Sequence, residues 1–135
     1  MKSISVWVFL LVGCSTKGPI PKQLGLTGDA TLKYASCSTA YTVTATDSSG
    51  SQVLLASNIV ITLGVQNKGG PLGAEFFTDA TCARQVATVS IEKGLSSATF
   101  YMKGFARSDL ELLVDDGPGA MKEAALEIQI TNSPL

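Results

Sequence analysis

The sequence predicts an all-β domain, an antiparallel β-sandwich of about seven to nine strands. The first indication is alternation: apolar side chains recur at every second position in several short segments, which is the period of a half-buried strand. The second is the spacing of turn residues, because Gly, Pro, Asp and Ser cluster between these segments. The third is composition, since Thr, Ser, Ala, Val and Gly are abundant and no segment forms a convincing amphipathic helix.

The first half of the chain contains five expected strands. Thr31 to Ala35 fits an edge strand, and in the next strand Tyr41, Val43 and Ala45 alternate with threonines. Asp47-Ser48-Ser49-Gly50 favours a turn, because Gly tolerates positive φ and an Asp side chain can accept hydrogen bonds from its own downstream backbone. The remaining segments are a short strand at 53–55, an alternating strand at 59–65, a break at 67–71 and a short strand at 74–77.

The second half repeats this pattern. Alternating segments at 87–91, 98–102, 110–114 and 126–130 place apolar residues on one side and mainly polar residues on the other. A turn at 93–94 and a loop at 115–119 separate them, and Met121 to Ala125 is expected to form one helical turn. One-sided alternation favours an antiparallel sandwich over a parallel sheet that is buried on both faces.

The N-terminal segment resembles the signal of a bacterial lipoprotein. Met1-Lys2 is a minimal positive region, Ile4 to Val12 is a short apolar stretch, and Leu11-Val12-Gly13-Cys14 resembles a lipobox. The stretch is shorter than the roughly 20 residues that a membrane-spanning helix needs. The resemblance implies cleavage before Cys14 and acylation of this residue, which makes a lipid bilayer the first expected partner. The alternatives are an ordinary secretory signal with an accidental cysteine, or a buried N-terminal strand.

This resemblance divides the chain into a signal peptide at 1–13, a lipidated Cys14 with a short tether at 14–23, and a β domain at 24–135. The tether is expected to be extended, because it contains Gly18, Pro19 and Pro21. Ser15 is not the aspartate that resembles an inner-membrane retention signal. The expected location is therefore the outer membrane, on its periplasmic or cell-surface side.

Lipidation of Cys14 leaves two cysteines, Cys37 and Cys82, in an exported domain. An even remainder outside the cytosol indicates a disulfide, and only one pairing is available. A bridge that closes so long a loop stabilises a domain by about 4 kcal/mol in the chain-entropy model. A standard zinc site is a poor alternative, because it needs more ligands than two thiols and the chain has no histidine. Free thiols would need a reducing compartment.

Three segments, in order, resemble those of a bacterial immunoglobulin-like domain. Residues 37–50 resemble its opening strand with Asp-x-x-Gly, residues 74–82 its Gly-x-Phe-Tyr-x-Asp-x-x-Cys segment, and residues 89–103 the following hairpin. The resemblance covers about residues 24–132 and implies an immunoglobulin-like sandwich that serves as a stalk, spacer or adhesive surface. A different sandwich or a jelly roll is the alternative. Unlike antibody domains, the domain has no core tryptophan, because Trp7 lies in the signal, and its bridge joins strand ends or loops.

Phe76, Phe77 and Tyr101 form the candidate binding surface. In an alternating strand one phenylalanine of the pair has to face outward, where it would lie with Tyr101 in an apolar patch. Alternatively, a loop beneath the disulfide shields that phenylalanine.

The residues needed for common catalytic and cofactor chemistry are missing or poorly placed. The absence of histidine excludes Ser-His-Asp and Cys-His nucleophiles and removes the commonest metal ligand. Ser90 and Lys93 have Ser-x-x-Lys spacing, but they fall at a strand end, where their side chains diverge. Asp115 and Asp116 could contribute to a calcium loop, yet without regular Asp-x-Asp spacing a solvated turn is favoured. We therefore expect no catalytic residue, no metal and no cofactor.

A formal net charge of −1 and the lack of a basic cluster argue against a nucleic-acid partner. The sequence favours a non-enzymatic lipoprotein whose β domain is a structural or binding module, for adhesion or recognition, at the cell envelope. Its second partner would be an unidentified protein or glycan. The alternative is an envelope-assembly accessory, such as a chaperone-like subunit of a secretion or pilus complex. A glycosidase or calcium-dependent hydrolase is a third, less favoured hypothesis.

Overall fold

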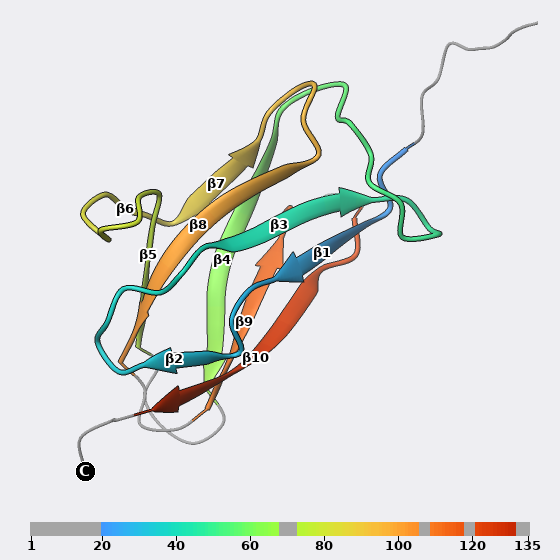
Figure 1. The fold of residues 1–135 in the computed structure, drawn as a ribbon. Coiled ribbons are helices and arrows are strands. Elements are labelled where there is room, and N and C mark those ends of the chain that lie inside the picture. Colours follow the sequence, from blue (N-terminus) through green and yellow to red (C-terminus); the bar gives the residue numbers. More distant parts are fainter. Residues whose placement is uncertain (1–19, 68–72, 106–108, 118–120, 132–135) are drawn as a thin grey trace, which may run out of the picture.

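The computed structural model describes residues 20–67, 73–105, 109–117 and 121–131, which form two five-stranded sheets (Figure 1). The first sheet has the order β1 (Gln23–Thr27), β3 (Tyr41–Thr46), β8 (Ser97–Gly104), β5 (Ala74–Phe77), β6 (Gln85–Val86). The second has the order β2 (Thr31–Lys33), β10 (Ala124–Thr131), β9 (Leu110–Asp115), β4 (Ile59–Asn67), β7 (Thr88–Ile91). The predicted all-β sandwich is confirmed, with ten strands among the described residues.

Most of the alternating segments form strands where they were predicted, but the short strand expected at 53–55 does not form, and nearby only Gln52 makes an isolated bridge, with Thr46. Other local expectations also differ. β1 and β6 were not predicted, and the expected strand at 31–35 ends at Lys33, because Ala35 has a φ of 58°. The helical turn expected from Met121 to Ala125 is wrong. Ala124 is the first residue of β10 and pairs with Val114, so strand pairing overrides the local helix propensity.

One strand pairing departs from the antiparallel prediction. β2 runs parallel to β10, with Thr31 opposite Gln129, whereas the other pairings between described strands are antiparallel. The cause is a change of sheet: β1 pairs with β3 in the first sheet, and three residues later the chain joins the second sheet as β2. The first strands therefore close one side of the sandwich.

The core lies between the two sheets and follows the predicted alternation. Every second residue is buried in β3, in β9 and in β8 from Phe100 onward, and no polar or charged side chain is buried in the part of the chain that the structure describes. The fully enclosed large side chains are Tyr41, Val43, Val53, Ile61, Ile91, Phe100, Met102, Leu110, Leu112, Val114 and Ile128.

Tyr41 fixes the change of sheet between β1 and β2. Its ring stacks on Phe100 at 5.8 Å between centroids, and its hydroxyl donates a 2.7 Å hydrogen bond to the carbonyl of Asp29. Burial, and then the charge of Asp29, raise the pKa of Tyr41 to about 12. Gly28 lies against this ring, so closely that a Cβ would lie 2.1 Å from Cδ1 of Tyr41. Glycine is therefore required at this bend.

The sandwich has two distinct ends. The N-terminal end is the end of the sandwich at which β1, β4, β8 and β10 begin and β3, β7 and β9 finish. The opposite end is called the C-terminal end. At the N-terminal end the two sheets are joined by hydrogen bonds, because the Leu24 amide donates to the Lys122 carbonyl at 2.9 Å. The chain enters at this end through Ile20, and β10 leaves toward the other (Figure 1).

Candidate functional site

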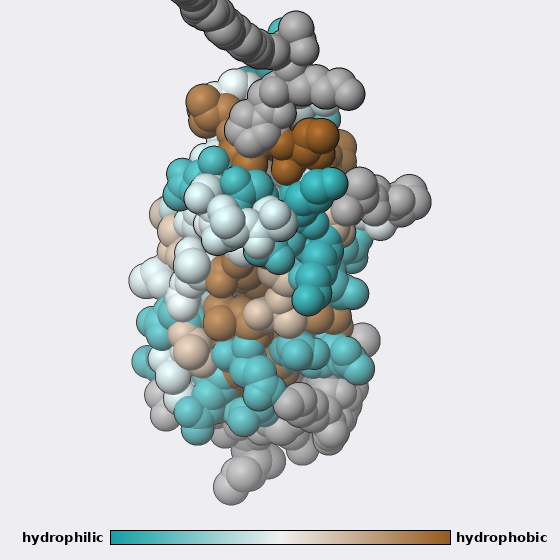
Figure 2. Space-filling model, turned by 90° about the vertical axis from the view of Figure 1, so that its right-hand side faces the viewer, coloured by the Kyte–Doolittle hydropathy of each residue, from teal (hydrophilic) through white to brown (hydrophobic). Residues whose placement is uncertain are grey.

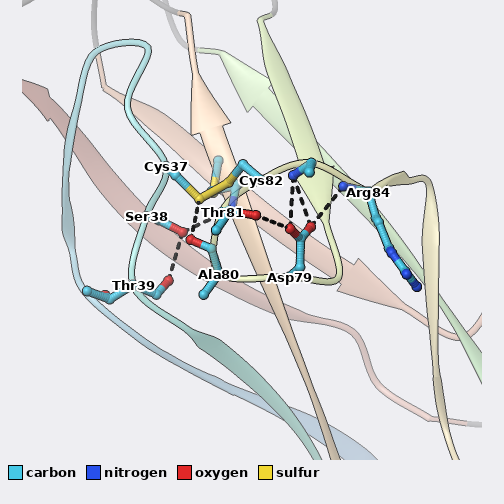
Figure 3. The surroundings of a disulfide bond; sticks show 10 residues. Cys37, Ser38, Thr39, Asp79, Ala80, Thr81, Cys82 and Arg84 are labelled. Carbon is cyan, nitrogen blue, oxygen red and sulfur yellow. Dashed lines mark hydrogen bonds between the residues drawn. A yellow bond between two sulfur atoms is a disulfide. The ribbon is translucent and has the colours of Figure 1, made fainter.

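The predicted disulfide between Cys37 and Cys82 is confirmed. It joins the loop that precedes β3 to the loop between β5 and β6, with 5.8 Å between the two Cα atoms (Figure 3). Both cysteines therefore lie outside strands, as the sequence indicated. Beside the bridge, Ser38 binds β8, the central strand of the first sheet: its hydroxyl accepts a hydrogen bond from the Met102 amide at 2.9 Å.

A carboxylate organises the loop that carries Cys82. Asp79 accepts hydrogen bonds from the amides of Ala83, at 3.0 Å, and Arg84, at 2.8 Å, and from the hydroxyl of Thr81 (Figure 3). The Asp79 carbonyl also accepts the Cys82 amide at 3.1 Å. These bonds hold Cys82 at a φ of 55°, in a region that L residues rarely adopt. The carboxylate therefore orients one half of the disulfide.

The same hydrogen bonds stabilise the charged form of Asp79. The Thr81 hydroxyl is the largest cause and the Arg84 amide the next, and together with the Ala83 amide they lower the pKa of Asp79 to about 2. Because the folded pKa lies below the ordinary 3.8, this contribution to stability is present above about pH 4 and is lost as the pH falls through 2.

We predict that Asp79→Asn flattens the acid limb of the stability curve. Thermal unfolding midpoints measured from about pH 5 to pH 2 should fall more steeply for the wild type than for the variant, with the two curves converging near pH 2. Thr81→Val, which removes only the largest hydrogen bond, should lie between them. Parallel curves for all three proteins would contradict this role of Asp79.

The predicted aromatic surface is wrong in one respect, because both phenylalanines are buried. Phe76 is 7% exposed and packs edge-on against Phe100 in the core, with 6.1 Å between ring centroids. Phe77 points away from the core but is only 5% exposed, and the Lys103 ammonium lies 5.7 Å from its ring centroid. Tyr101, which is half-buried, lies opposite Phe77 across the β5–β8 pair. Binding through this face stays a prediction that now depends on Tyr101 and Lys103.

The remaining candidate carboxylates serve turns. Asp47 accepts the amides of Ser49 and Ser51 at 2.9 and 3.0 Å, and the Ser49 hydroxyl is the main cause that lowers its pKa. Asp115 accepts the Gly117 amide at 2.7 Å. Asp116 accepts that of Met121 at 3.4 Å. These contacts are those of the solvated turn favoured by the sequence.

Two observations on the described residues concern the predictions about metals and membranes. Residues 20–67, 73–105, 109–117 and 121–131 contain no group of three or more acidic, cysteine or histidine side chains that could hold a metal ion. Within the same ranges, no helix has the length and apolar character needed to cross a bilayer. Ser90 lies exposed on β7 and Lys93 in the turn that follows it, so the pair falls at a strand end, as the sequence indicated. Cys14 lies outside the described residues.

Comparisons with known proteins support the fold. No protein-family model and no curated protein matches the sequence. Among solved structures, a glycosyl hydrolase family 2 member from Bacteroides cellulosilyticus aligns over 88% of this chain with a TM-score of 0.58 and 12% identity. A β-glycosidase from Bacteroides vulgatus aligns over 85% (0.57, 15% identity), and the β-glucuronidase of Parabacteroides merdae over 88% (0.55, 13% identity).

These matches concern one part of much longer proteins. The chain corresponds to 15%, 15% and 13% of the three glycosidase chains, respectively. The matched parts are immunoglobulin-like domains, so the chain has an all-β, immunoglobulin-like sandwich fold with one disulfide. At this level of identity the likeness shows the fold alone.

Proposed function

We propose that this chain is a bacterial lipoprotein, held on the outer membrane through acylated Cys14, whose immunoglobulin-like domain is a structural or binding module. The observation that carries the proposal is the arrangement of the two ends. The segment that follows Cys14 joins the sandwich at its N-terminal end, and the last strand, β10, runs to the opposite end. A domain anchored in this way would present its C-terminal end away from the bilayer.

The internal construction of the domain supports a passive role. The core is apolar, the disulfide ties the β3 side of the first sheet to its β5 side, and Asp47, Asp79 and Asp115 are each engaged by backbone amides. These carboxylates stabilise turns and are not paired with one another. The likeness to glycosidases covers a domain of those enzymes and brings no catalytic chemistry to this chain.

A protein or glycan is the proposed second partner. The outer face of β8 and β5 offers Tyr101 and Lys103, a phenol and an ammonium that lie on the same side of one strand. An aromatic ring beside a cation suits either a sugar or an acidic protein surface. The sequence left two hypotheses, a structural or binding module and an envelope-assembly accessory. Crosslinking in intact cells would distinguish them, because an envelope-assembly accessory would yield one stoichiometric partner.

The experiment that tests anchoring is Cys14→Ala. In bacteria fed an alkyne-tagged fatty acid, we expect the wild type to be labelled and to fractionate with membranes, because acyl chains contribute about 0.8 kcal/mol per buried CH₂. The variant should be unlabelled and leave the membrane fraction, whereas the matched control Thr16→Ala, which keeps the cysteine, should behave as the wild type. A native chain that begins at Met1 without acyl groups would overturn the proposal.

A further inference from the structure

We propose that the N-terminal end of the sandwich is itself a lipid-contacting surface, where Leu54 and Leu95 insert into the interface of the bilayer that anchors the chain. This inference rests on the proposed function, because acylated Cys14 is what brings this end to the bilayer. It specifies how the anchored domain is oriented: the N-terminal end, with these two leucines, faces the membrane.

Large hydrophobic side chains that remain exposed are concentrated at this end. Of the five among the described residues, Ile20, Leu54, Val60 and Leu95 lie at the N-terminal end, with exposed fractions of 54%, 70%, 54% and 53%. The fifth, Phe105, follows β8 at the C-terminal end and is 36% exposed. Figure 2 shows hydrophobic surface at the top of the molecule, beside the place where the N-terminal segment leaves. Such grouping, unlike scattered single residues, is typical of a contact surface.

Backbone hydrogen bonds hold the two leucines next to each other. The Leu55 amide donates to the Leu95 carbonyl at 2.9 Å, and the Gly94 amide donates to the Leu55 carbonyl at 2.8 Å. Val53 and Leu55 are buried, so Leu54 between them points outward through the alternation of an extended chain. The pair therefore projects from a fixed backbone, which is how a rigid domain can present apolar side chains to lipid.

The length of the tether selects the bilayer as the occupant. Cys14 precedes Ile20 by six positions, a separation that an extended chain spans in at most about 20 Å. β10 runs from the N-terminal end to the C-terminal end over eight residues, roughly 25 Å at the rise of a strand. With Cys14 acylated, the bilayer surface thus stays within reach of Leu54 and Leu95 and distant from the far end.

The charges around the leucines show what kind of lipid surface suits them. The exposed lysines at this end, Lys22, Lys93 and Lys122, are accompanied there by carboxylates, those of Asp47, Glu92, Asp115, Asp116 and Glu123. A mixed surface of this kind favours neither anionic nor cationic headgroups. The contact is therefore apolar, and we expect it on zwitterionic phosphatidylcholine and at high salt alike.

A tryptophan depth probe tests this inference. Trp7 is the only tryptophan of the sequence and precedes Cys14, so the lipidated chain contains none. We would purify the full lipidated protein with Leu54→Trp, or with Thr131→Trp at the C-terminal end as the matched control, and reconstitute each in phosphatidylcholine vesicles with brominated acyl chains. Mass spectrometry would first establish the acyl groups, and thermal unfolding the fold. Leu95→Trp is the second probe if Leu54→Trp does not fold.

We expect the Leu54→Trp emission to shift to shorter wavelength and to be largely quenched by the bromines, and the Thr131→Trp emission to be unaffected. An acylated protein whose Leu54→Trp emission is unquenched overturns the inference and leaves the proposed function intact. A chain without acyl groups overturns both. Quenching at both positions shows a domain lying flat, and a blue shift without quenching, together with crosslinked dimers, shows that a second copy covers the leucines; either result overturns the inference.

Discussion

Replacing Cys37 and Cys82 together by serine is expected to destabilise the domain by about 4 kcal/mol, because the bridge closes a loop with a sequence separation of 45 residues. Small domains have total stabilities of about 5–15 kcal/mol, so the variant should unfold at much lower denaturant concentration or fail to fold. Urea unfolding followed by circular dichroism measures the difference. Both cysteines lie in loops, so the substitutions remove no contact between paired strands.

Reduction of the wild type provides the control for this prediction. A reductant should shift the unfolding midpoint of the wild type to that of the Cys37→Ser/Cys82→Ser protein and leave the variant unchanged. If the wild type keeps its midpoint after its thiols are shown to be free, the loop between Cys37 and Cys82 is held by other contacts, and the assignment of this stability to the bridge is wrong.

Phe100→Ala is expected to destabilise the domain by about 3–5 kcal/mol, the range for removing a buried aromatic side chain. Phe100 is fully buried, stacks on Tyr41 and makes an edge-on contact with Phe76, so its removal would deprive two other aromatic rings of a contact at once. The cavity would also loosen the ring on which Gly28 is packed. Chemical denaturation monitored by tyrosine fluorescence measures the effect.

Phe105→Ala is the matched control for Phe100→Ala. This ring is 36% exposed and makes one edge-on contact, with Tyr34 at 6.1 Å between centroids. Because more than a third of this residue stays in contact with solvent and it lies outside the core, we expect a loss near 1 kcal/mol or below. Equal losses for the two variants would show that the core is not centred on Phe100.

The alternation of side chains was sufficient to predict most of the sheet. β3, β9 and the part of β8 from Phe100 onward bury every second residue as expected, since burial on one face imposes a period of two. β1 was not predicted as a strand: the expected tether ended at Gln23, the first residue of β1, and Gly25 interrupts the short alternation that follows. The two residues of β6 carry no pattern of their own and are held by pairing with Phe76 and Phe77. Local sequence therefore identifies strands that carry the core better than strands that only extend a sheet.

The surface features depended on contacts between distant parts of the chain. Phe77, for example, is buried with Lys103 of the neighbouring strand β8 over its ring. The hydrogen bond from the Leu55 amide to the Leu95 carbonyl, which brings the segment of Leu54 to that of Leu95, joins residues that are far apart in the sequence. The role of Asp79 is local, because its carboxylate binds amides four and five positions ahead, but the segment 74–82 was interpreted only as a resemblance and no role was predicted for this aspartate. The disulfide, by contrast, followed from counting cysteines once Cys14 was set aside.

The parallel pair of β2 and β10 has a mechanical consequence. If the chain is tethered at its beginning and gripped at its far end, tension slides these strands along each other, and the hydrogen bonds between Thr31–Lys33 and Gln129–Thr131 are loaded simultaneously in shear. Once the strands separate, the sulfur–sulfur bond carries the tension directly from Cys37 to Cys82, so the residues between them add nothing to the extended length. The domain therefore lengthens less under force than the same chain with its thiols reduced.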